Sequence, residues 1–291
     1  MYPASFDYVA PSTLDQALDI LADRGDDAKV LAGGQSLIPL MKLRFAQPSL
    51  LVDINRIAGL DYIDAPDGYL RIGALVRHND VVASDVVRRS NHTVAHAAPW
   101  VSDPLVRNLG TVCGSLAHAD PQGDWASVML ACGAEVVARK ADGIRTIPVS
   151  ELITGVFTTQ LAPDELITEV RVPTYTGPSG GTYLKLERKV GDYATVGVAT
   201  HLTLGTGGTI AAAGIALTAV AATNVKAVEA ERVLVGATSG EDVFREAGRL
   251  AAAAADPRDD VRGSAEYKRH VVDVFVQRGL ATAAEIAGAA A

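Results

Sequence analysis

The sequence is poor in cysteine and has no cluster of metal ligands. Only two of its 291 residues are cysteines, Cys113 and Cys132, and their spacing matches neither a zinc site nor a redox Cys-x-x-Cys motif. Two thiols cannot supply the thiolate ligands of an iron–sulfur cluster. A disulfide framework is therefore excluded, and we expect no metal site on this chain. If the protein works with an iron–sulfur cluster, another chain must carry it.

The sequence also lacks an excess of positive charge and a long apolar run. Its formal net charge is -8 and its pI is about 5.2, which argues against a nucleic-acid partner because phosphate backbones bind to basic faces. Its apolar runs are interrupted well before the ~20 residues of a membrane-spanning helix. The first residues carry no basic segment followed by an apolar core, so we expect no secretory signal and a cytoplasmic protein.

The composition is that of a globular protein with a sizeable core, since 48% of the residues are hydrophobic and 21% are charged. The residue patterns predict an α+β chain. We expect a first domain at 1–175, with subdomains at about 1–55 and 56–175, and a second domain at 176–291 that begins with a glycine-rich linker at 176–181. The first domain is expected to contain helices at 12–25, around 79–83 and at 125–132, a helix that includes residues 41–44, and a helical stretch toward residue 99. Its strands are expected at 28–31, 50–54, 69–73, 135–140, 144–148 and 164–173. The second is expected to contain strands at 182–190, 197–204 and 209–220, followed by helices at 225–234, 241–255 and 265–278.

Two loops rich in glycine and hydroxyl residues carry the functional signal. The first, at 31–36, lies between a short apolar strand and a helix that contains Pro39, and its two glycines permit positive φ and close backbone approach. The second, at 107–115, has the same character. Backbone N–H groups at such turns suit a pyrophosphate. The alternative is that each loop is a plain connection; the sequence fits neither a Rossmann fingerprint nor a P-loop.

The residue sequences of these motifs resemble those of a known protein family. Ala-Gly-Gly-Gln-Ser-Leu-Ile-Pro-Leu-Met-Lys-Leu-Arg at 32–44, Arg-Asn-Leu-Gly-Thr-x-x-Gly-Ser at 107–115, Asp-Pro-x-x-Asp at 120–124 and Gly-Asp-Tyr-Ala at 191–194 are similar to the FAD-binding medium subunit of the molybdenum hydroxylases. That family includes carbon monoxide dehydrogenase and xanthine dehydrogenase. The resemblance implies a two-subdomain FAD-binding domain of the vanillyl-alcohol-oxidase (PCMH) type, followed by an α+β domain of three strands and three helices.

The resemblance also implies roles for individual residues. The pyrophosphate of FAD would lie between the two loops, and a flavin further needs polar groups at its ribityl chain and ring. The positions that match pyrophosphate-binding residues are Leu31, Ala32, Gly33, Gly34, Gln35, Ser36, Thr111, Val112, Cys113, Gly114 and Ser115. The positions that match other cofactor contacts are Asp120, Asp124, Ile167, Lys185 and, as the catalytic aromatic residue near the ring face, Tyr193.

Several of these residues have a second interpretation that the sequence leaves open. Asp124 matches the aspartate that bonds a ribityl hydroxyl, yet it could also cap the following helix, and Asp120 could simply form a turn. Lys185 could be an exposed residue of an alternating strand, and Tyr193 could be a core anchor. Lys42 and Arg44 could lie near an anion or be solvated cations.

Six positions bear further on the chemistry. His78, His92 and His96 lack metal-ligand company and are predicted to be surface or capping histidines. Cys113 stands where many relatives have glycine and Ser115 where several have Asn or Asp, so the second loop could be tighter or redox-sensitive. Gln35 replaces a histidine that is frequent in carbon monoxide dehydrogenases, which favours an organic substrate.

The resemblance predicts an FAD subunit that takes electrons from a small [2Fe–2S] subunit and passes them to an external acceptor. A large molybdenum-cofactor subunit would hydroxylate the substrate, such as an N-heterocycle, in what is expected to be a dimer of heterotrimers. The alternatives are the medium subunit of a carbon monoxide dehydrogenase, a self-sufficient FAD-dependent oxidoreductase, and a flavin-less assembly subunit. The self-sufficient enzyme would need its own acid–base pair.

Overall fold

The computed structural model describes residues 2–289, so the expected outer domain limits at 1 and 291 lie outside the described residues. The chain begins with a small parallel sheet of order β1-β3-β2. Its elements are β1 (Asp7–Val9), α1 (Leu14–Arg24), β2 (Ala28–Leu31), α2 (Leu37–Lys42) and β3 (Leu50–Asp53). The expected β-α-β unit is therefore present, and it places the loop 31–36 at the carboxyl end of β2.

The predicted start of α1 and the predicted end of α2 were wrong. Helix α1 is capped by Thr13, whose Oγ1 accepts a hydrogen bond from Gln16 N at 3.3 Å, and not by Ser12. Helix α2 ends at Lys42, because Arg44 adopts a positive φ of 61° that a helix cannot continue. The predicted end of α1 at Gly25, which has a φ of 50°, is confirmed.

The second part of the chain forms a five-stranded antiparallel sheet with the order β4-β5-β10-β6-β7. Its strands are β4 (Ile63–Asp64), β5 (Tyr69–Gly73), β6 (Glu135–Lys140), β7 (Gly143–Pro148) and β10 (Leu166–Pro173). Its helices are α3 (His78–Ala83), α4 (Asp85–Ser90), α5 (His92–Ala97), α6 (Pro104–Arg107), α7 (Val112–His118), α8 (Asp124–Ala131) and α9 (Val149–Leu152), and a small hairpin is made of β8 (Ile153–Gly155) and β9 (Thr158–Thr159). The predicted hairpin and the predicted strand that ends at Pro173 are confirmed.

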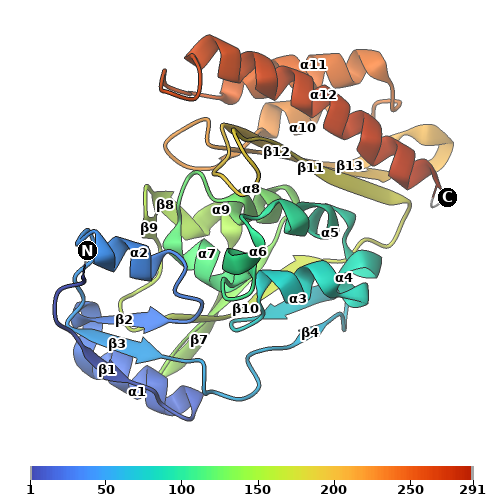
Figure 1. Ribbon diagram of the computed structural model, residues 1–291. Coiled ribbons are helices and arrows are strands. Elements are labelled where there is room, and N and C mark those ends of the chain that lie inside the picture. Colours follow the sequence, from blue (N-terminus) through green and yellow to red (C-terminus); the bar gives the residue numbers. More distant parts are fainter. Residues whose placement is uncertain (1, 290–291) are drawn as a thin grey trace.

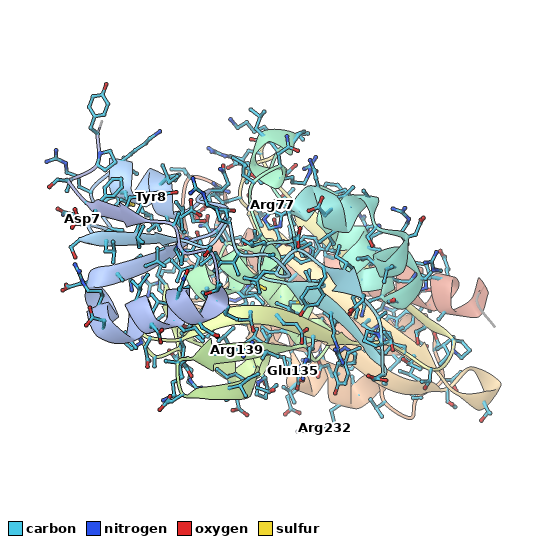
Figure 2. All side chains as sticks on the ribbon, turned by 90° about the horizontal axis from the view of Figure 1, so that it is seen from below. Asp7, Tyr8, Arg77, Glu135, Arg139 and Arg232 are labelled. Carbon is cyan, nitrogen blue, oxygen red and sulfur yellow. The ribbon has the colours of Figure 1, made fainter. Side chains whose placement is uncertain are left out.

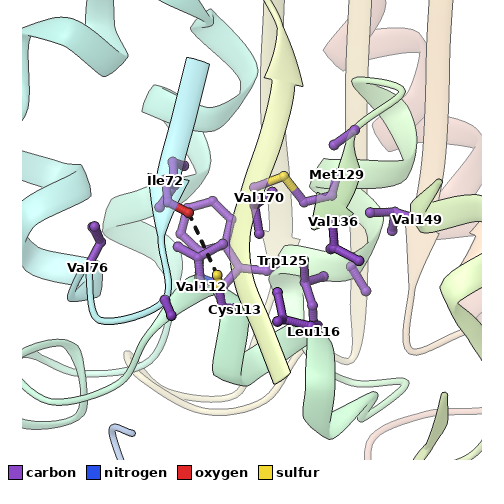
Figure 3. Close-up of a cluster of buried hydrophobic side chains, with 14 of the residues drawn as sticks. Ile72, Val76, Val112, Cys113, Leu116, Trp125, Met129, Val136, Val149 and Val170 are labelled. Carbon is purple, nitrogen blue, oxygen red and sulfur yellow. Dashed lines mark hydrogen bonds between the residues drawn. The ribbon is translucent and has the colours of Figure 1, made fainter. Parts of the chain in front are cut away.

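The hydrophobic core of this part lies between the antiparallel sheet and helices α7 and α8 (Figure 3). Trp125 on α8 is fully buried and packs among aliphatic side chains from β5, α7 and β10. The same cluster includes residues of α1 and β3, so both sheets share one core. This common packing fixes the two glycine-rich loops relative to each other.

The C-terminal part is a four-stranded antiparallel sheet of order β11-β12-β13-β14. Its elements are β11 (Ser179–Leu186), β12 (Val196–Leu204), β13 (Ile210–Thr218), β14 (Val225–Lys226), α10 (Val228–Leu234), α11 (Glu241–Ala254) and α12 (Ala265–Ala289). Helices α10, α11 and α12 cover one face of this sheet, whereas α5 and α8 pack against its other face (Figure 1). A second hydrophobic cluster fills the space under the three helices.

Three details of this part differ from the sequence-based expectation. Residues 179–181 belong to β11 and are not a linker, because a side chain at Gly180 would overlap Ala283 O of α12, so glycine lets helix and strand approach closely. The short strand β14 occupies the start of the helix predicted at 225–234. Helix α12 continues well beyond residue 278. Among residues 2–289, no helix combines the length and apolarity needed to cross a membrane.

Candidate functional site

A cavity of about 730 Å³ lies where the two sheets of the N-terminal part meet strand β11. This volume falls within the range of about 300–1,000 Å³ that is typical of small-molecule and cofactor sites. Most of the predicted site residues line it, namely Leu31, Ala32, Gly33, Gly34, Gln35, Ser36, Thr111, Cys113, Gly114, Ser115, Asp124, Ile167, Lys185 and Tyr193. Segments far apart in the sequence thus meet around one space.

The first loop owes its shape to two glycines with different roles. Gly34 adopts a positive φ of 70°, which glycine tolerates best. Gly33 has no positive φ, so the expectation of one there was wrong. A side chain at Gly33 would instead overlap Leu109 O and lie 2.8 Å from Gly110 Cα. Gly33 therefore allows the first loop to touch the second.

The first loop also presents free hydrogen-bond donors to the cavity. Within residues 2–289, the backbone N–H groups of residues 33–36 have no hydrogen-bond acceptor. Ser36 precedes α2, and its hydroxyl makes no capping bond to that helix. The Gln35 amide donates back to Gly33 O at 3.3 Å. Several N–H groups at one turn form a concave donor surface that fits a pyrophosphate.

The second loop leads into α7 through Thr111. The Oγ1 atom of Thr111 accepts a hydrogen bond from Gly114 N at 3.1 Å, which leaves its own proton free to donate. Gly110 packs against His78, because a side chain there would lie 2.7 Å from His78 Nε2. Val112 is fully buried and does not line the cavity, so only its backbone could contribute to ligand binding.

A hydrogen-bonded bridge that sequence reasoning missed joins the two loops. Arg77 Nη1 donates to Leu109 O at 2.6 Å, and Arg77 Nη2 donates to Asn55 Oδ1 at 2.6 Å. Asn55 Nδ2 in turn donates to Ala32 O at 2.8 Å. Arg77, the N-cap residue of α3, is labelled in Figure 2. A guanidinium and an amide thus fix a carbonyl group of each loop, while the N–H groups of residues 33–36 in the first loop have no acceptor among the described residues.

Asp124 and Lys185 form a buried ion pair at the cavity wall. Lys185 Nζ lies 2.9 Å from Asp124 Oδ2, and the two side chains are 1% and 7% exposed. Gly123 is the N-cap of α8 and Asp124 is its first residue, so the capping interpretation was wrong. The interpretation of Lys185 as an exposed strand residue was also wrong.

The neighbours of this pair set its electrostatics. Burial raises the pKa of the Asp124 carboxyl, and the Lys185 ammonium and the Tyr183 hydroxyl act in the opposite direction. Lys185 Nζ also donates to Trp100 O at 3.0 Å and lies 3.4 Å from Glu187 Oε2. The ammonium is therefore held by three oxygen atoms while it faces the cavity.

His78 is part of the site, contrary to the prediction of a surface or capping histidine. It is buried and lines the cavity, and its Nδ1 accepts a hydrogen bond from Trp125 Nε1 at 3.1 Å. Burial lowers the pKa of His78 to about 4, and the nearby Arg107 and Arg77 act in the same direction. The imidazole is therefore neutral at pH 7. His92 and His96 are exposed, as predicted, and His96 Nδ1 accepts a hydrogen bond from Tyr183 N at 3.3 Å.

Tyr193 stands on a loop that covers one side of the cavity. Its side chain is 48% exposed and lines the cavity, so it is not a core anchor. Gly191, with a φ of 85°, turns this loop, and Arg262 Nη1 holds it by donating to Tyr193 O at 2.6 Å. Partial burial raises the pKa of the Tyr193 hydroxyl.

The remaining predicted residues have mixed positions. Asp120 does not line the cavity, and its Oδ1 accepts from Gln122 N at 2.9 Å, as expected of a turn former. Ile167 lines the cavity at an irregularity in the pairing of β10 with β6, a feature that often occurs next to functional sites. Cys113 packs in the core with its Sγ toward Ile72 O (Figure 3). Burial raises the pKa of its thiol, which does not favour redox sensitivity.

The fold and the cavity define a class of proteins with a cofactor-sized cavity between two glycine-rich loops. The chain belongs to the family of FAD-binding subunits of molybdenum hydroxylases, as its resemblance predicted. Residues 4–175 match the FAD binding domain in molybdopterin dehydrogenase, and residues 181–283 match the CO dehydrogenase flavoprotein C-terminal domain. It is thus an FAD-dependent oxidoreductase subunit.

Individual relatives match along almost the whole chain. The chain is 41% identical to the 6-hydroxypseudooxynicotine dehydrogenase complex subunit alpha of Paenarthrobacter nicotinovorans, over 97% of this chain and 96% of that one. It superposes with a TM-score of 0.95 on a chain of carbon monoxide dehydrogenase from Hydrogenophaga pseudoflava, at 40% identity over 98% and 99% of the two chains. Quinoline 2-oxidoreductase from Pseudomonas putida 86 gives a TM-score of 0.92 at 33% identity, over 99% of each chain. The likeness therefore extends to both parts of the fold.

Proposed function

We propose that this chain carries electrons through a bound FAD, from a [2Fe–2S] cluster on a small subunit to an external acceptor. A large subunit with a molybdenum cofactor oxidises the substrate. The observation that carries the proposal is the cavity between two donor-rich loops. Residues 2–289 also contain no group of three or more His, Cys, Asp or Glu side chains that could hold a metal ion, so the other redox centres belong to partner chains.

The residues of the cavity divide by the part of FAD that they suit. The N–H groups of residues 33–36 and the hydroxyl groups of Ser36 and Thr111 suit the pyrophosphate. Asp124 suits a ribityl hydroxyl, the ammonium of Lys185 suits the pyrimidine end of the ring, and Tyr193 suits a ring face. Ile167 offers its backbone at the irregularity in β10. When bound, the flavin supplies the capacity to accept and release electrons.

The self-sufficient oxidoreductase is the weaker alternative. Such an enzyme needs an acid–base pair next to its substrate. The carboxyl of Asp124 is engaged by Lys185 and Tyr183, and the Nδ1 atom of His78 is engaged by Trp125. The Asp124 carboxyl and the Nδ1 atom of His78 are thus already engaged by other protein groups.

The large subunit selects the substrate of the whole enzyme. We propose that this substrate is an organic compound such as an N-heterocycle. The relatives named above include dehydrogenases of a nicotine derivative and of quinoline as well as a carbon monoxide dehydrogenase, so the medium subunit of a carbon monoxide dehydrogenase is the alternative. Gln35, which replaces the histidine frequent in carbon monoxide dehydrogenases, donates its side-chain amide to Gly33 O of its own loop. We further propose a dimer of heterotrimers in the cytoplasm and a domain boundary near residue 175.

Purification of this chain, alone and with its partners, tests the proposal. We expect the isolated chain to bind one FAD noncovalently, so that acid precipitation releases the yellow colour. It should be reducible by dithionite and should hydroxylate no substrate without partner chains. A colourless protein that takes up no FAD would overturn the assignment, and substrate hydroxylation by the lone chain would contradict the role as a subunit.

Replacing Tyr193 with alanine should change the reoxidation of the bound FAD more than its affinity. Loss of a partly exposed aromatic contact costs at most about 1.5 kcal/mol, roughly tenfold in affinity. Reoxidation by an artificial acceptor should become faster, because one cover of the cavity is removed. Stopped-flow reoxidation and FAD titration measure the two effects. Tyr267, on α12 and 47% exposed, is a matched control because it does not line the cavity. Wild-type reoxidation in the Tyr193→Ala variant would remove Tyr193 from the site.

A further inference from the structure

The hydroxyl of Tyr183 binds the carboxylate that Lys185 also binds. Tyr183 lies on β11, two residues before Lys185, so both side chains emerge on the same face of the strand. The Tyr183 hydroxyl donates to Asp124 Oδ1 at 2.6 Å, and Lys185 Nζ donates to Asp124 Oδ2 at 2.9 Å. One strand of the C-terminal sheet therefore supplies a separate donor to each carboxylate oxygen.

The surrounding residues fix the position of this hydroxyl. Tyr183 is fully buried, and Gly197 on the neighbouring strand β12 leaves the space for its ring, since a side chain at Gly197 would overlap the hydroxyl. Thr218 Oγ1 on β13 lies 3.4 Å from the hydroxyl and is itself hydrogen-bonded to Ser127 Oγ of α8. The hydroxyl thus lies in a closed polar network between the C-terminal sheet and helix α8.

We propose that Tyr183 is a positioning residue that keeps Asp124 in its ionised form, and that the C-terminal domain thereby sets the net charge beside the flavin. Tyr183 itself does not line the cavity, whereas Asp124 and Lys185 do. With Asp124 ionised, Lys185 lies between two carboxylates, those of Asp124 and Glu187. With Asp124 protonated, Glu187 remains as a carboxylate partner of Lys185, and the net charge beside the cavity is more positive by one unit. This inference rests on the proposed function, because it takes FAD to be the ligand of the cavity.

The direction of the effect follows from the groups that face Asp124. Burial raises the pKa of Asp124, Lys185 and the Tyr183 hydroxyl lower it, and Glu187 at the end of β11 raises it. Tyr193, on the covering loop, also interacts with this carboxylate. Removal of the Tyr183 hydroxyl therefore raises the pKa of Asp124 further. In the pH range between the wild-type and variant pKa values, the variant holds one more proton, and the added positive charge favours the reduced, anionic cofactor.

The test is the FAD midpoint potential of the full chain, measured as a function of pH for Tyr183→Phe and Tyr175→Phe. Tyr175 is a matched control: its hydroxyl is buried, it stacks on His201 of β12 with ring centroids 3.6 Å apart, and it does not line the cavity. We expect Tyr183→Phe to bind FAD and to shift its potential upward. A tenfold change in the ratio of reduced to oxidised FAD affinities corresponds to about 30 mV for a two-electron couple. Tyr175→Phe should match the wild type.

Each outcome bears on the inference separately from the proposed function. Absence of FAD from the wild-type chain would overturn the proposed function. If FAD is bound and the midpoint potential of Tyr183→Phe equals that of the wild type at every pH, the inference is wrong and the proposed function stands. The same holds if Tyr175→Phe shifts the potential as much as Tyr183→Phe does. Loss of FAD from a folded Tyr183→Phe chain would also contradict it, because the hydroxyl would then serve binding. Should Tyr183→Phe not fold, Asp124→Asn removes the same charge, and a wild-type potential in that variant would refute the role of this carboxylate.

Discussion

Gly33→Val is expected to abolish FAD binding while the fold is retained. The new side chain would overlap Leu109 O and crowd Gly110 Cα, so the two loops must separate. Overpacking a close contact with a larger side chain typically costs about 1–3 kcal/mol, which corresponds to about a 5- to 150-fold loss of affinity, and the separation of the two loops adds to that loss. Titration of the FAD-depleted chain with FAD, followed by absorbance, measures the loss, and circular dichroism checks the fold.

Two further variants make the Gly33 result specific. Gly288→Ala is the control, because a methyl group there meets no atom within 4 Å. Ser36→Ala should cost about 1 kcal/mol, the value of a neutral hydrogen bond, so its loss of affinity should be far smaller than that of Gly33→Val. If Gly33→Val bound FAD as tightly as the wild type, the pyrophosphate would not lie at this contact.

Lys185→Met should lower the free energy of unfolding of the FAD-depleted chain by about 3–5 kcal/mol, the usual cost of removing one partner of a buried ion pair. The substitution leaves the Asp124 carboxylate, 7% exposed, without its cation, and it removes the ammonium that faces Glu187. Urea unfolding measures the loss. The double variant Lys185→Met, Asp124→Asn should recover part of it, because no buried carboxylate is then left unpaired.

The pH dependence of this loss gives an independent check. Lys185 holds down the pKa of Asp124, which burial already raises, so the pKa rises further in Lys185→Met. The folded variant then binds a proton more readily than the unfolded chain, and its stability increases as the pH falls through the raised pKa. The stability deficit should therefore be smaller in acid than at neutral pH. Lys140→Met, which removes an exposed ion pair with Asp142, should change little. A deficit independent of pH would show that lost packing, not charge, is responsible.

The elements of the fold could be predicted where local chemistry decides them. The short apolar strand before Gly33 and the hairpin at 135–148 follow from residue pattern and turn residues. The segment 179–181 could not be assigned, because its two glycines indicate a linker by composition. Their true cause is the close approach of α12 at Gly180, a contact between residues about a hundred positions apart.

The sequence motifs predicted most of the residues that line the cavity, but not the hydrogen-bond and ion-pair partners of these residues. The two loops carry recognisable residues, and most of them do line the cavity. Arg77 and Asn55 were missed because their role depends on carbonyl groups of other loops. His78 was placed at the surface because nothing near it in the sequence indicates Trp125 as its partner. Lys185 lies on a strand whose alternation alone favours an exposed side chain, and only the fold brings it to Asp124.

The cavity wall is completed by residues that the ribosome makes last. The two donor-rich loops lie before residue 116, whereas Lys185 and Tyr193 belong to the C-terminal part of the chain. Domains generally fold in order as they leave the ribosome. A nascent chain that ends near residue 175 has the two glycine-rich loops but lacks Lys185 and Tyr193. We therefore expect a fragment that ends near residue 175 to bind FAD more weakly than the full chain.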